Sequence, residues 1–408
     1  MNNEEKYKCS FCLKDYAEVR NVIIGESSSV CNECVTLCNE AIDIFNYEDT
    51  SDFLLLPIQI FEALNKDIIG QEKAKKILAV AVYNHYKILA ETSPIEKNDI
   101  EKTNVLIVGP TGCGKTLLVQ TLADLLNVPF VTVDATTLTE VGYAGEDVES
   151  VIVRLFHAAA GDVWKTETGI VYIDEIDKIS RKSENNSKDI SGEGVQQALL
   201  KLMEGMIVSV QSQEGSKQGE EEVIDIDTKN ILFICSGAFI GLEKIIKKRK
   251  SNTAIGFTAP LSNDVNNQIN NKLFSNIEPE DLIKFGLIPE FIGRLSQIVA
   301  VSSMSKEMLI RILVEPENSL INQYKKLFLY NNVNLIFQDS SLDEIAKIAI
   351  KRNIGARGLR SVIESILIDV MFEIPSKNNV TSVVVDGECV RRLSKPRYIE
   401  DKKTTKSI

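Results

Sequence analysis

Apolar runs of strand length alternate with helical patterns through the middle of the chain. The runs stand at Asn104–Val108, Val128–Val133, Gly169–Ile173 and Ile231–Cys235, and helical periodicity covers Leu117–Leu126 and Asp147–Ala160. Continuous apolar runs, unlike alternating ones, are typical of strands buried on both faces. The pattern therefore predicts an α/β fold with a doubly wound parallel sheet flanked by helices.

The pattern changes after about residue 303. Helical periodicity covers Met308–Phe328, Leu342–Arg352 and Leu359–Phe372, and a strand pattern follows at Val380–Val385. This predicts a smaller α/β domain that follows the large one. We expect a cysteine-rich module over residues 1–46, a linker over 47–64, the large domain over 65–303, the small domain over 304–398 and a disordered tail over 399–408.

Composition narrows the class of protein. The chain has 408 residues, of which 44% are hydrophobic and 25% charged, and its net charge is −12. Such a charge gives no broad attraction to nucleic acid or to an anionic membrane surface. The sequence contains no apolar stretch long enough to span a bilayer, and its first residues are acidic, unlike a signal peptide. We therefore expect a cytoplasmic protein with neither nucleic acid nor membrane as a partner.

One loop carries specific chemistry. Gly109-Pro110-Thr111-Gly112-Cys113-Gly114-Lys115-Thr116 lies between the first apolar run and a helical pattern, as a phosphate-binding loop requires. The glycines allow backbone N–H groups to surround phosphate oxygens, Lys115 supplies a positive charge, and the Thr116 hydroxyl is suited to Mg²⁺. The sequence thus predicts a nucleoside triphosphate site. An ordinary Gly-rich turn is the alternative.

Two acids follow the apolar run at Gly169–Ile173. Asp174 is suited to bind Mg²⁺, and Glu175 to polarise the water that attacks a γ-phosphate. The alternative is a pair of acids that begin a helix. Two arginines, Arg294 and Arg357, offer planar cations for a polyphosphate, although arginines of this kind more often form surface salt bridges.

Four of the eight cysteines have metal-ligand spacing. Cys9 and Cys12, and then Cys31 and Cys34, form two Cys-x2-Cys pairs. Two such pairs are typical of a structural zinc site with four thiolates, which would organise a segment too short to bury a core by itself. Two disulfides or free thiols are the alternatives. Acidic residues outnumber basic ones in this module, which favours protein contacts over phosphate contacts.

Taken together, these motifs resemble the ClpX family of AAA+ unfoldases, which feed the ClpP peptidase. The resemblance runs from about Cys9 to about Pro396 and combines the four-cysteine module with this phosphate-binding loop. It implies an AAA+ P-loop ATPase fold with a small α/β lid domain and an N-terminal zinc module. The cofactors that it implies are ATP, Mg²⁺ and Zn²⁺. Residues 67–71 and 80–86 resemble the elements that enclose adenine, which implies roles for Ile69 and Tyr83.

The resemblance also implies an assembly. It predicts a homohexameric ring in which Arg294 acts as an arginine finger on a neighbouring subunit, while Arg357 contacts nucleotide in its own subunit. Tyr143, between glycines, resembles the aromatic residue of a pore loop that grips protein substrates. Ile255, Gly256 and Phe257 resemble the loop that docks on ClpP, a peptidase. Further implied partners are adaptors and a second zinc module, through dimerisation.

From the residues alone, Tyr143 also fits a β-turn, and Ile255–Phe257 also fits a buried turn of a long insertion.

Three functions are compatible with these motifs. The leading one is an ATP-driven protein unfoldase and translocase without peptidase activity of its own, because the sequence has only two histidines and both lie in helical segments of the motor domain. A nucleic-acid motor or clamp-loader-like ATPase is the second, since a fold does not fix its substrate. A scaffold that binds ATP without turnover is the third. Arguing against it is the intact set of Lys115, Asp174, Glu175, Arg294 and Arg357.

Overall fold

The computed structural model describes residues 8–15, 19–25, 28–38, 55–91, 102–139, 146–180, 190–212, 222–251, 273–352, 354–377 and 379–400. The chain divides into two compact units. One comprises Met1–Leu55 with Tyr86–Asp99, and the other, called the main unit below, comprises Leu56–His85 with Ile100–Ile408. Among the described helices, none has both the length and the apolar character needed to cross a membrane.

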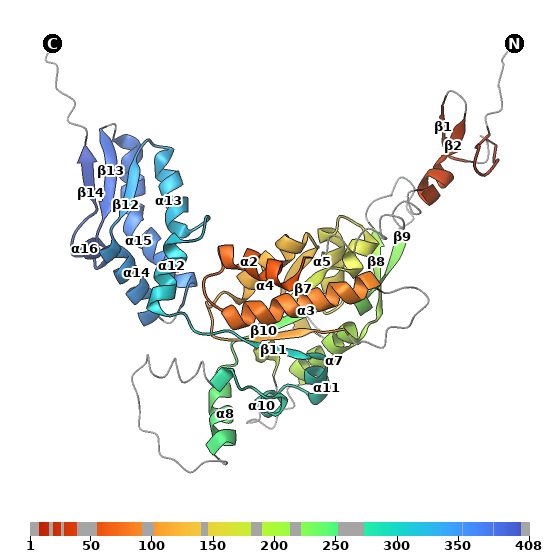
Figure 1. The fold of residues 1–408 in the computed structure, drawn as a ribbon, viewed down its shortest axis with the longest axis horizontal. Helices are drawn as coiled ribbons and strands as arrows, with labels where there is room; N and C mark the ends of the chain where they lie inside the picture. Colours follow the sequence, from red (N-terminus) through yellow and green to blue (C-terminus); the bar gives the residue numbers. More distant parts are fainter. Residues whose placement is uncertain are drawn as a thin grey trace. The chain divides into compact units, whose positions relative to one another are not determined.

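A parallel sheet of five strands forms the centre of the main unit (Figure 1). Its strand order is β11-β3-β10-β7-β4, and every neighbouring pair is parallel. Its three central strands, β3, β10 and β7, are buried along almost their whole length, as their apolar runs predict. The strands are β3 (Val105–Val108), β4 (Phe130–Asp134), β7 (Ile170–Asp174), β10 (Leu232–Gly237) and β11 (Gln297–Ala300).

Helices cover the sheet, and in Figure 1 α2 and α4 lie above β10 and β11 while α7 and α11 lie below them. The helices are α2 (Pro57–Asp67), α3 (Glu72–Glu91), α4 (Lys115–Leu126), α5 (Ser150–Ala158), α6 (Val163–Glu167), η3 (Ile176–Ile179), α7 (Ile190–Glu204), η4 (Thr228–Asn230), α8 (Leu242–Ser251), α10 (Pro279–Phe285) and α11 (Pro289–Arg294). Two short pairs complete this part: β5 (Leu138–Thr139) with β6 (Glu146–Asp147), and β8 (Ile207–Ser212) with β9 (Glu222–Asp227).

The fold class predicted from the sequence is confirmed. Each of the four predicted strands and both predicted helices of the large domain is present within a few residues of its expected bounds. The fifth strand, β11, was not predicted. It is short and only partly buried, so its sequence lacks the continuous apolar run that marks the central strands.

A smaller α/β domain follows from Lys306. It has its own core, in which Leu309, Ile345, Ile363 and Val383 are fully buried. Strand β13 pairs in parallel with β12 and antiparallel with β14. The elements are α12 (Lys306–Val314), α13 (Leu320–Leu329), β12 (Asn334–Phe337), α14 (Asp339–Lys351), α15 (Arg357–Glu373), η5 (Ile374–Ser376), β13 (Val380–Val385), α16 (Gly387–Val390) and β14 (Arg397–Glu400).

The structure divides the helical stretch that was predicted over Met308–Phe328. Helix α12 ends at Val314 and α13 begins at Leu320. Pro316 has no N–H to continue the first helix, and the Ser319 hydroxyl accepts a hydrogen bond from the Asn322 N–H at 3.4 Å, which caps the second helix. The apolar periodicity is similar in α12 and α13, so the sequence pattern alone did not indicate that the helix is interrupted.

Two predicted boundaries also differ from the structure. The linker was expected over residues 47–64, but α2 begins at Pro57 and buries Ile60 and Leu64, which lie one helical turn apart on the same face. The disordered tail was expected from residue 399, but β14 continues to Glu400 because Ile399 pairs with Ser382. Residues 39–54 and 401–408 lie outside the described part of the chain.

The N-terminal unit contains a hairpin and a short helix. Strands β1 (Val22–Ile24) and β2 (Ser29–Cys31) pair antiparallel, and residues 32–38 are helical. Its buried centre consists of Cys9, Cys31 and Cys34, with three valines packed around them. The cysteines therefore occupy the place that a hydrophobic core holds in a larger domain.

Candidate functional site: a nucleotide cavity and a four-cysteine centre

The phosphate-binding loop connects β3 to α4. Gly112 and Gly114 have φ angles of +76° and +92°, a conformation that a residue with a Cβ adopts at a cost. Gly109 has a different constraint, because a Cβ there would come within 2.6 Å of the Val301 carbonyl oxygen on the segment after β11. Backbone conformation or close packing therefore favours glycine at each of these three positions. The loop ends at the N-terminus of α4, where the helix dipole favours an anion.

Lys115 and Thr116 begin α4 and both line the cavity next to the loop. The Lys115 side chain is 8% exposed, and its ammonium group donates hydrogen bonds to the carbonyl oxygens of Gly109 at 2.8 Å and Pro110 at 3.1 Å. The Thr116 hydroxyl donates to Asp174 Oδ2 at 3.3 Å. The lysine charge and the threonine hydroxyl are therefore held on the same side of the loop, where a polyphosphate and its metal would lie.

Asp174 and Glu175 follow each other at the end of β7. Asp174 is half-buried and accepts hydrogen bonds from the Glu175 N–H at 2.9 Å and the Ser236 hydroxyl at 2.5 Å. Glu175 is exposed and has a left-handed backbone, with φ +57° and ψ +32°. A non-glycine residue in this conformation costs about 1 kcal/mol, so surrounding contacts must hold it there. The turn places the two neighbouring carboxylates in different environments, one half-buried and one exposed.

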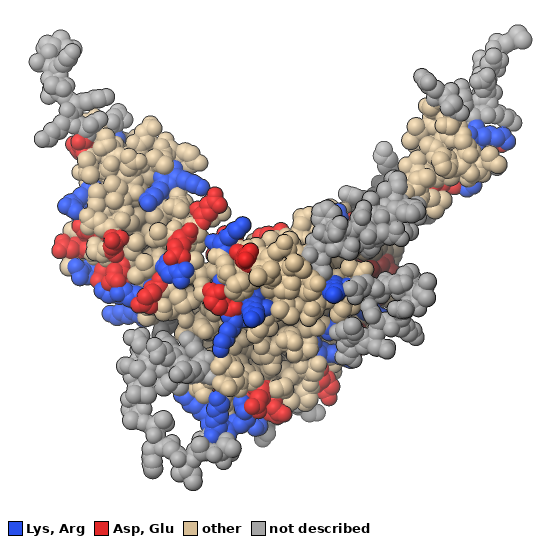
Figure 2. Space-filling model, in the orientation of Figure 1, with Lys and Arg blue, Asp and Glu red and all other residues tan. Residues whose placement is uncertain are grey.

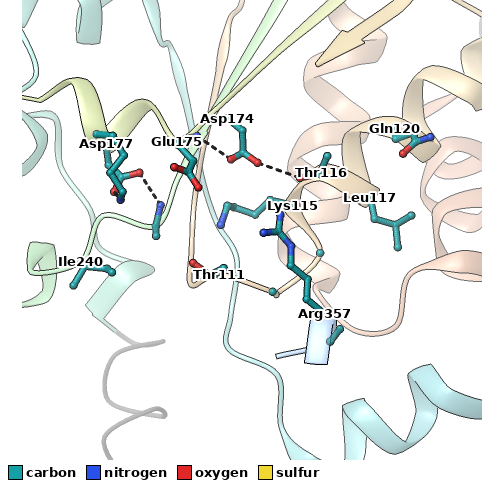
Figure 3. Close-up of a pocket in the computed structure, with 15 residues that line it drawn as sticks. Thr111, Lys115, Thr116, Leu117, Gln120, Asp174, Glu175, Asp177, Ile240 and Arg357 are labelled. Carbon is teal, nitrogen blue, oxygen red and sulfur yellow. Dashed lines mark hydrogen bonds and ion pairs between the residues drawn. The ribbon is translucent and has the colours of Figure 1, made fainter. Parts of the chain in front are cut away.

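The cavity that these residues line has a volume of about 510 Å³ (Figure 3). Arg357 enters it from the start of α15, and in Figure 3 its guanidinium points into the same space as the Lys115 ammonium group. Asp174 and Glu175 lie on the opposite side of the lysine. Two cations facing two acids across one cavity suit a polyphosphate with a bound divalent cation.

The loop also touches the turn that precedes α15. The Ala356 N–H donates to the Gly112 carbonyl oxygen at 3.0 Å. The backbones are so close that a Cβ on Gly355 would lie 2.6 Å from that oxygen, and a Cβ on Gly112 would lie 2.2 Å from the Ile354 oxygen. Arg357 is therefore attached to the phosphate-binding loop through backbone contacts one residue away.

A second cavity, of about 350 Å³, borders the other side of the loop. Its apolar lining includes Cys113, Phe239, Met304, Leu309 and Ile350. Cys113 is 2% exposed, and burial raises the pKa of its thiol. Ile69 and Tyr83, which were predicted to enclose adenine, line neither of these two cavities. Their adenine role stays a prediction.

Tyr172 and Ser236 are site residues that sequence reasoning missed. The Tyr172 hydroxyl lies 2.7 Å from Ser236 Oγ and 3.4 Å from the Thr116 hydroxyl. The Ser236 hydroxyl in turn donates a hydrogen bond to Asp174. Burial, followed by the charge of Asp174, raises the pKa of Tyr172. A signal exists in the sequence, because Ser236 follows the apolar run Ile231–Cys235 and so stands at the carboxyl end of a predicted central strand.

Arg294 lies outside the cavity of its own chain. It ends α11, is 41% exposed at its side chain and forms an ion pair with Glu204 at the end of α7, at 2.9 Å. It does not line the cavity that contains Arg357. Tyr143 of the predicted pore loop and Ile255, Gly256 and Phe257 of the predicted docking loop lie outside the described residues.

The N-terminal unit brings the four predicted zinc ligands together. The sulfur atoms of Cys9, Cys12, Cys31 and Cys34 all lie within 4.8 Å of one another, and none of the four forms a disulfide. The Cys31 N–H donates to Cys9 Sγ at 3.3 Å, and the Cys34 N–H to Cys31 Sγ at 3.4 Å.

Backbone hydrogen bonds, first that of Cys12, lower the pKa of Cys9 to about 6, whereas burial raises that of Cys34. Four converging sulfurs with N–H support fit a structural Zn²⁺.

Comparisons with known proteins agree with this geometry. A family model described as the ClpX C4-type zinc finger matches residues 7–43, and a model of the AAA domain (Cdc48 subfamily) matches residues 100–298. Residues 304–385 match the C-terminal, D2-small domain of ClpB protein. The chain is 50% identical over 390 residues to the ATP-dependent Clp protease ATP-binding subunit ClpX of Borrelia duttonii (strain Ly), which covers 94% of this chain and 90% of that protein.

Proposed function

The chain belongs to the ClpX family, and on this basis we propose that it is an ATP-dependent protein unfoldase that delivers unfolded chains to the ClpP peptidase. It is an AAA ATPase of ClpX type. The observation that carries the proposal is the single cavity where Lys115, Thr116, Asp174, Glu175 and Arg357 meet. These residues supply what hydrolysis of a nucleoside triphosphate requires: cations for the phosphates, ligands for a metal and a carboxylate for water.

Each residue has a task in the proposed reaction. The loop N–H groups and Lys115 bind the β- and γ-phosphates, and Arg357 places a second cation near them. Thr116 and Asp174 would hold Mg²⁺, which neutralises phosphate charge when bound. Glu175 orients a water molecule towards the γ-phosphate and accepts its proton. We propose that the nucleotide base lies in the second cavity, beside Phe239 and Met304. Ile69 and Tyr83 do not line that cavity, so this placement competes with the role predicted for them around adenine.

The proposed assembly is a homohexamer. Arg294 would reach the nucleotide of the neighbouring subunit, a role supported by its partly exposed position outside the cavity of its own chain. An arginine that acts in trans is worth roughly 10³ to 10⁵ in rate where such fingers are known. Arg357 would act in its own subunit, where its backbone neighbour already contacts the phosphate-binding loop.

The remaining partners are proposed from the sequence and from exposed surface. Tyr143 would grip protein substrates in the ring's pore, and Ile255–Phe257 would dock on ClpP. Adaptors and dimerisation are assigned to the zinc module, on which Phe11, Leu13 and Ile23 are 68%, 71% and 63% exposed. Exposed apolar side chains on so small a unit favour a protein partner.

The charge distribution favours a protein substrate over a nucleic acid. Acidic and basic side chains are interspersed over the small domain on the face shown in Figure 2. Helix α8 carries several lysines, but its Arg249 is bound by Asp281 and Glu278, which places acids beside the basic helix. Nucleic-acid binding normally needs a continuous basic surface. The alternative, a nucleic-acid motor or clamp-loader-like ATPase, is therefore an outcome for the experiment to exclude.

The deciding experiment follows the fluorescence of a stably folded reporter with a terminal degradation tag. We expect the purified chain to abolish the fluorescence in the presence of MgATP. The Glu175→Gln variant should bind ATP but leave the reporter folded, because an amide accepts no proton from water. If DNA stimulates ATP hydrolysis and the reporter stays folded, the result would instead support the nucleic-acid motor. If the chain hydrolyses no ATP, the result would support a scaffold.

A further inference from the structure

A buried glutamine on α7 lies between two segments that carry catalytic groups. Gln196 is 0% exposed. Its Nε2 donates to the Ile179 carbonyl oxygen at 2.7 Å, and its Oε1 accepts from the Ile288 N–H at 2.8 Å. Ile179 is the last residue of the short helix that follows Glu175, and Ile288 immediately precedes the helix that ends at Arg294. One side chain therefore binds both segments.

The Ile179 contact fixes the segment that follows Glu175. Helix η3 begins one residue after Glu175 and ends at Ile179. Its Asp177 accepts a hydrogen bond from the Ala238 N–H at 3.1 Å, which attaches the segment to the residue that follows β10. Gln196 attaches the last carbonyl group of η3 to α7. The close approach of α7 at Gly192, where a Cβ would lie 2.8 Å from the Ile179 oxygen, leaves little freedom. The left-handed backbone of Glu175 depends on such constraints.

The Ile288 contact fixes the start of the helix that carries Arg294. Helix α11 has only six residues, and Ile288 is its N-cap. At its other end the Asn104 side-chain amide, 1% exposed, donates to the Arg294 carbonyl oxygen at 3.2 Å. Glu204, also on α7, contacts the Arg294 guanidinium. Buried amides thus hold both ends of α11, and α7 sets its distance from η3.

We propose that Gln196 is a positioning residue for ATP hydrolysis, which holds Glu175 and Arg294 in fixed relation through its two hydrogen bonds. The inference rests on the proposed function, because it assumes that Glu175 acts on the ATP of its own subunit and Arg294 on the ATP of the neighbouring subunit. Few uncharged side chains can both donate a hydrogen bond to one backbone group and accept one from another, as this buried amide does. An apolar side chain of the same length would leave both backbone groups unpaired. A displacement of about 1 Å at catalytic groups can cost about 100-fold in rate.

The first test replaces Gln196 by methionine and compares it with Thr228→Val. Thr228 is also 0% exposed, and its hydroxyl also links two backbone groups, the Leu202 oxygen and the Met206 N–H, both at 2.9 Å. None of these three residues lines the cavity. ATP turnover is measured per assembled ring, with assembly checked by sedimentation. We expect kcat to fall about 10- to 100-fold in Gln196→Met, with KM within about twofold, and to stay within about twofold in Thr228→Val.

The second test is the pH dependence of Gln196→Glu. A protonated carboxyl group donates one hydrogen bond and accepts another, so it restores both contacts, and burial raises the pKa of a carboxyl group. Activity relative to the unaltered chain should be greatest at low pH and fall as the pH rises and the carboxyl group ionises. Gln196→Met should show no such recovery.

The outcomes are distinct. An unaltered kcat in assembled Gln196→Met, or an equal fall in Thr228→Val, would overturn the positioning role while the proposed function stands. If Gln196→Met does not assemble, the pH profile of Gln196→Glu decides, and a profile parallel to that of the unaltered chain overturns the inference. If the unaltered chain itself does not hydrolyse ATP, the proposed function fails and the inference fails with it.

Discussion

Hydroxyl groups extend the site behind Asp174. The Ser236 hydroxyl binds Asp174 Oδ1, and the Tyr172 hydroxyl in turn binds Ser236. Tyr172 and Ser236 are both fully buried, so each needs a hydrogen-bond partner and each restricts the other. The orientation of the carboxylate that we propose for Mg²⁺ is therefore set by a chain of two hydroxyl groups rather than by Asp174 alone.

At this scale we predict that Ser236→Ala raises the Mg²⁺ concentration needed for half-maximal ATPase activity by about tenfold, because partners of metal ligands typically contribute 10- to 100-fold. Activity is measured against free Mg²⁺ at saturating ATP. Ser209→Ala is the control, since the Ser209 hydroxyl also binds an aspartate, Asp225 at 2.7 Å, but at an exposed position of β8. An unchanged Mg²⁺ dependence in Ser236→Ala would show that Asp174 needs no support.

Two elements far apart in sequence meet beside the cavity that contains Lys115 and Arg357. The phosphate-binding loop precedes α4, and the turn at Gly355 precedes α15 of the small domain. Their contact is between backbones, with Gly112 and Gly355 both at positive φ. A contact of this kind leaves no room for side chains, so it transmits small movements of one element directly to the other.

At the level of elements we predict that Gly355→Ala weakens ATP binding about tenfold. Its φ of +60° disfavours alanine, and the new Cβ would lie 2.6 Å from the Gly112 oxygen, which forces α15 and Arg357 away from the loop. Titration with a fluorescent ATP analogue measures the effect. Gly161→Ala controls for backbone strain, because Gly161 also has a positive φ, +81°. A Cβ added there would lie 3.8 Å from the nearest atom, in the Phe156 ring, which is an ordinary contact distance. Equal losses in both variants would assign the effect to φ alone.

At the scale of the whole molecule, the chain consists of two units with separate cores. The buried cluster of the N-terminal unit contains Cys9, Cys31 and Cys34 and shares no residue with the clusters of the large and small domains. So small a core cannot offset the entropy of folding by itself, whereas a structural zinc contributes on the order of 10 kcal/mol. The stability of the two units therefore has different physical sources.

We predict that a zinc-selective chelator, with Mg²⁺ in excess, unfolds the N-terminal unit and leaves basal ATP turnover within about twofold. The four thiols of the site should become reactive towards a thiol reagent as zinc is released. Cys34→Ser should behave like the chelated chain. A fall in ATP turnover in step with zinc release would show that the motor depends on the zinc module for its folding or assembly.

The sequence determined the features whose residues are close together in the chain. The phosphate-binding loop occupies eight consecutive positions, and Asp174 and Glu175 directly follow the apolar run Gly169–Ile173, so local pattern and chemistry were enough. The cysteine pairs predicted their own cluster, because zinc requires four sulfurs at one point. Alternating apolar runs and helical patterns likewise predicted the parallel sheet.

Only the tertiary structure decided which distant residues meet. Strand order places Ser236 of β10 beside Asp174 of β7, and domain packing places Gly355 against Gly112. The two bonds of Gln196 join three elements that no periodic pattern relates. Such contacts depend on how complete elements pack, and the sequence around each residue is compatible with many packings. Short stretches of sequence therefore determined which chemical groups the site contains, and the tertiary fold determined how these groups are arranged in space.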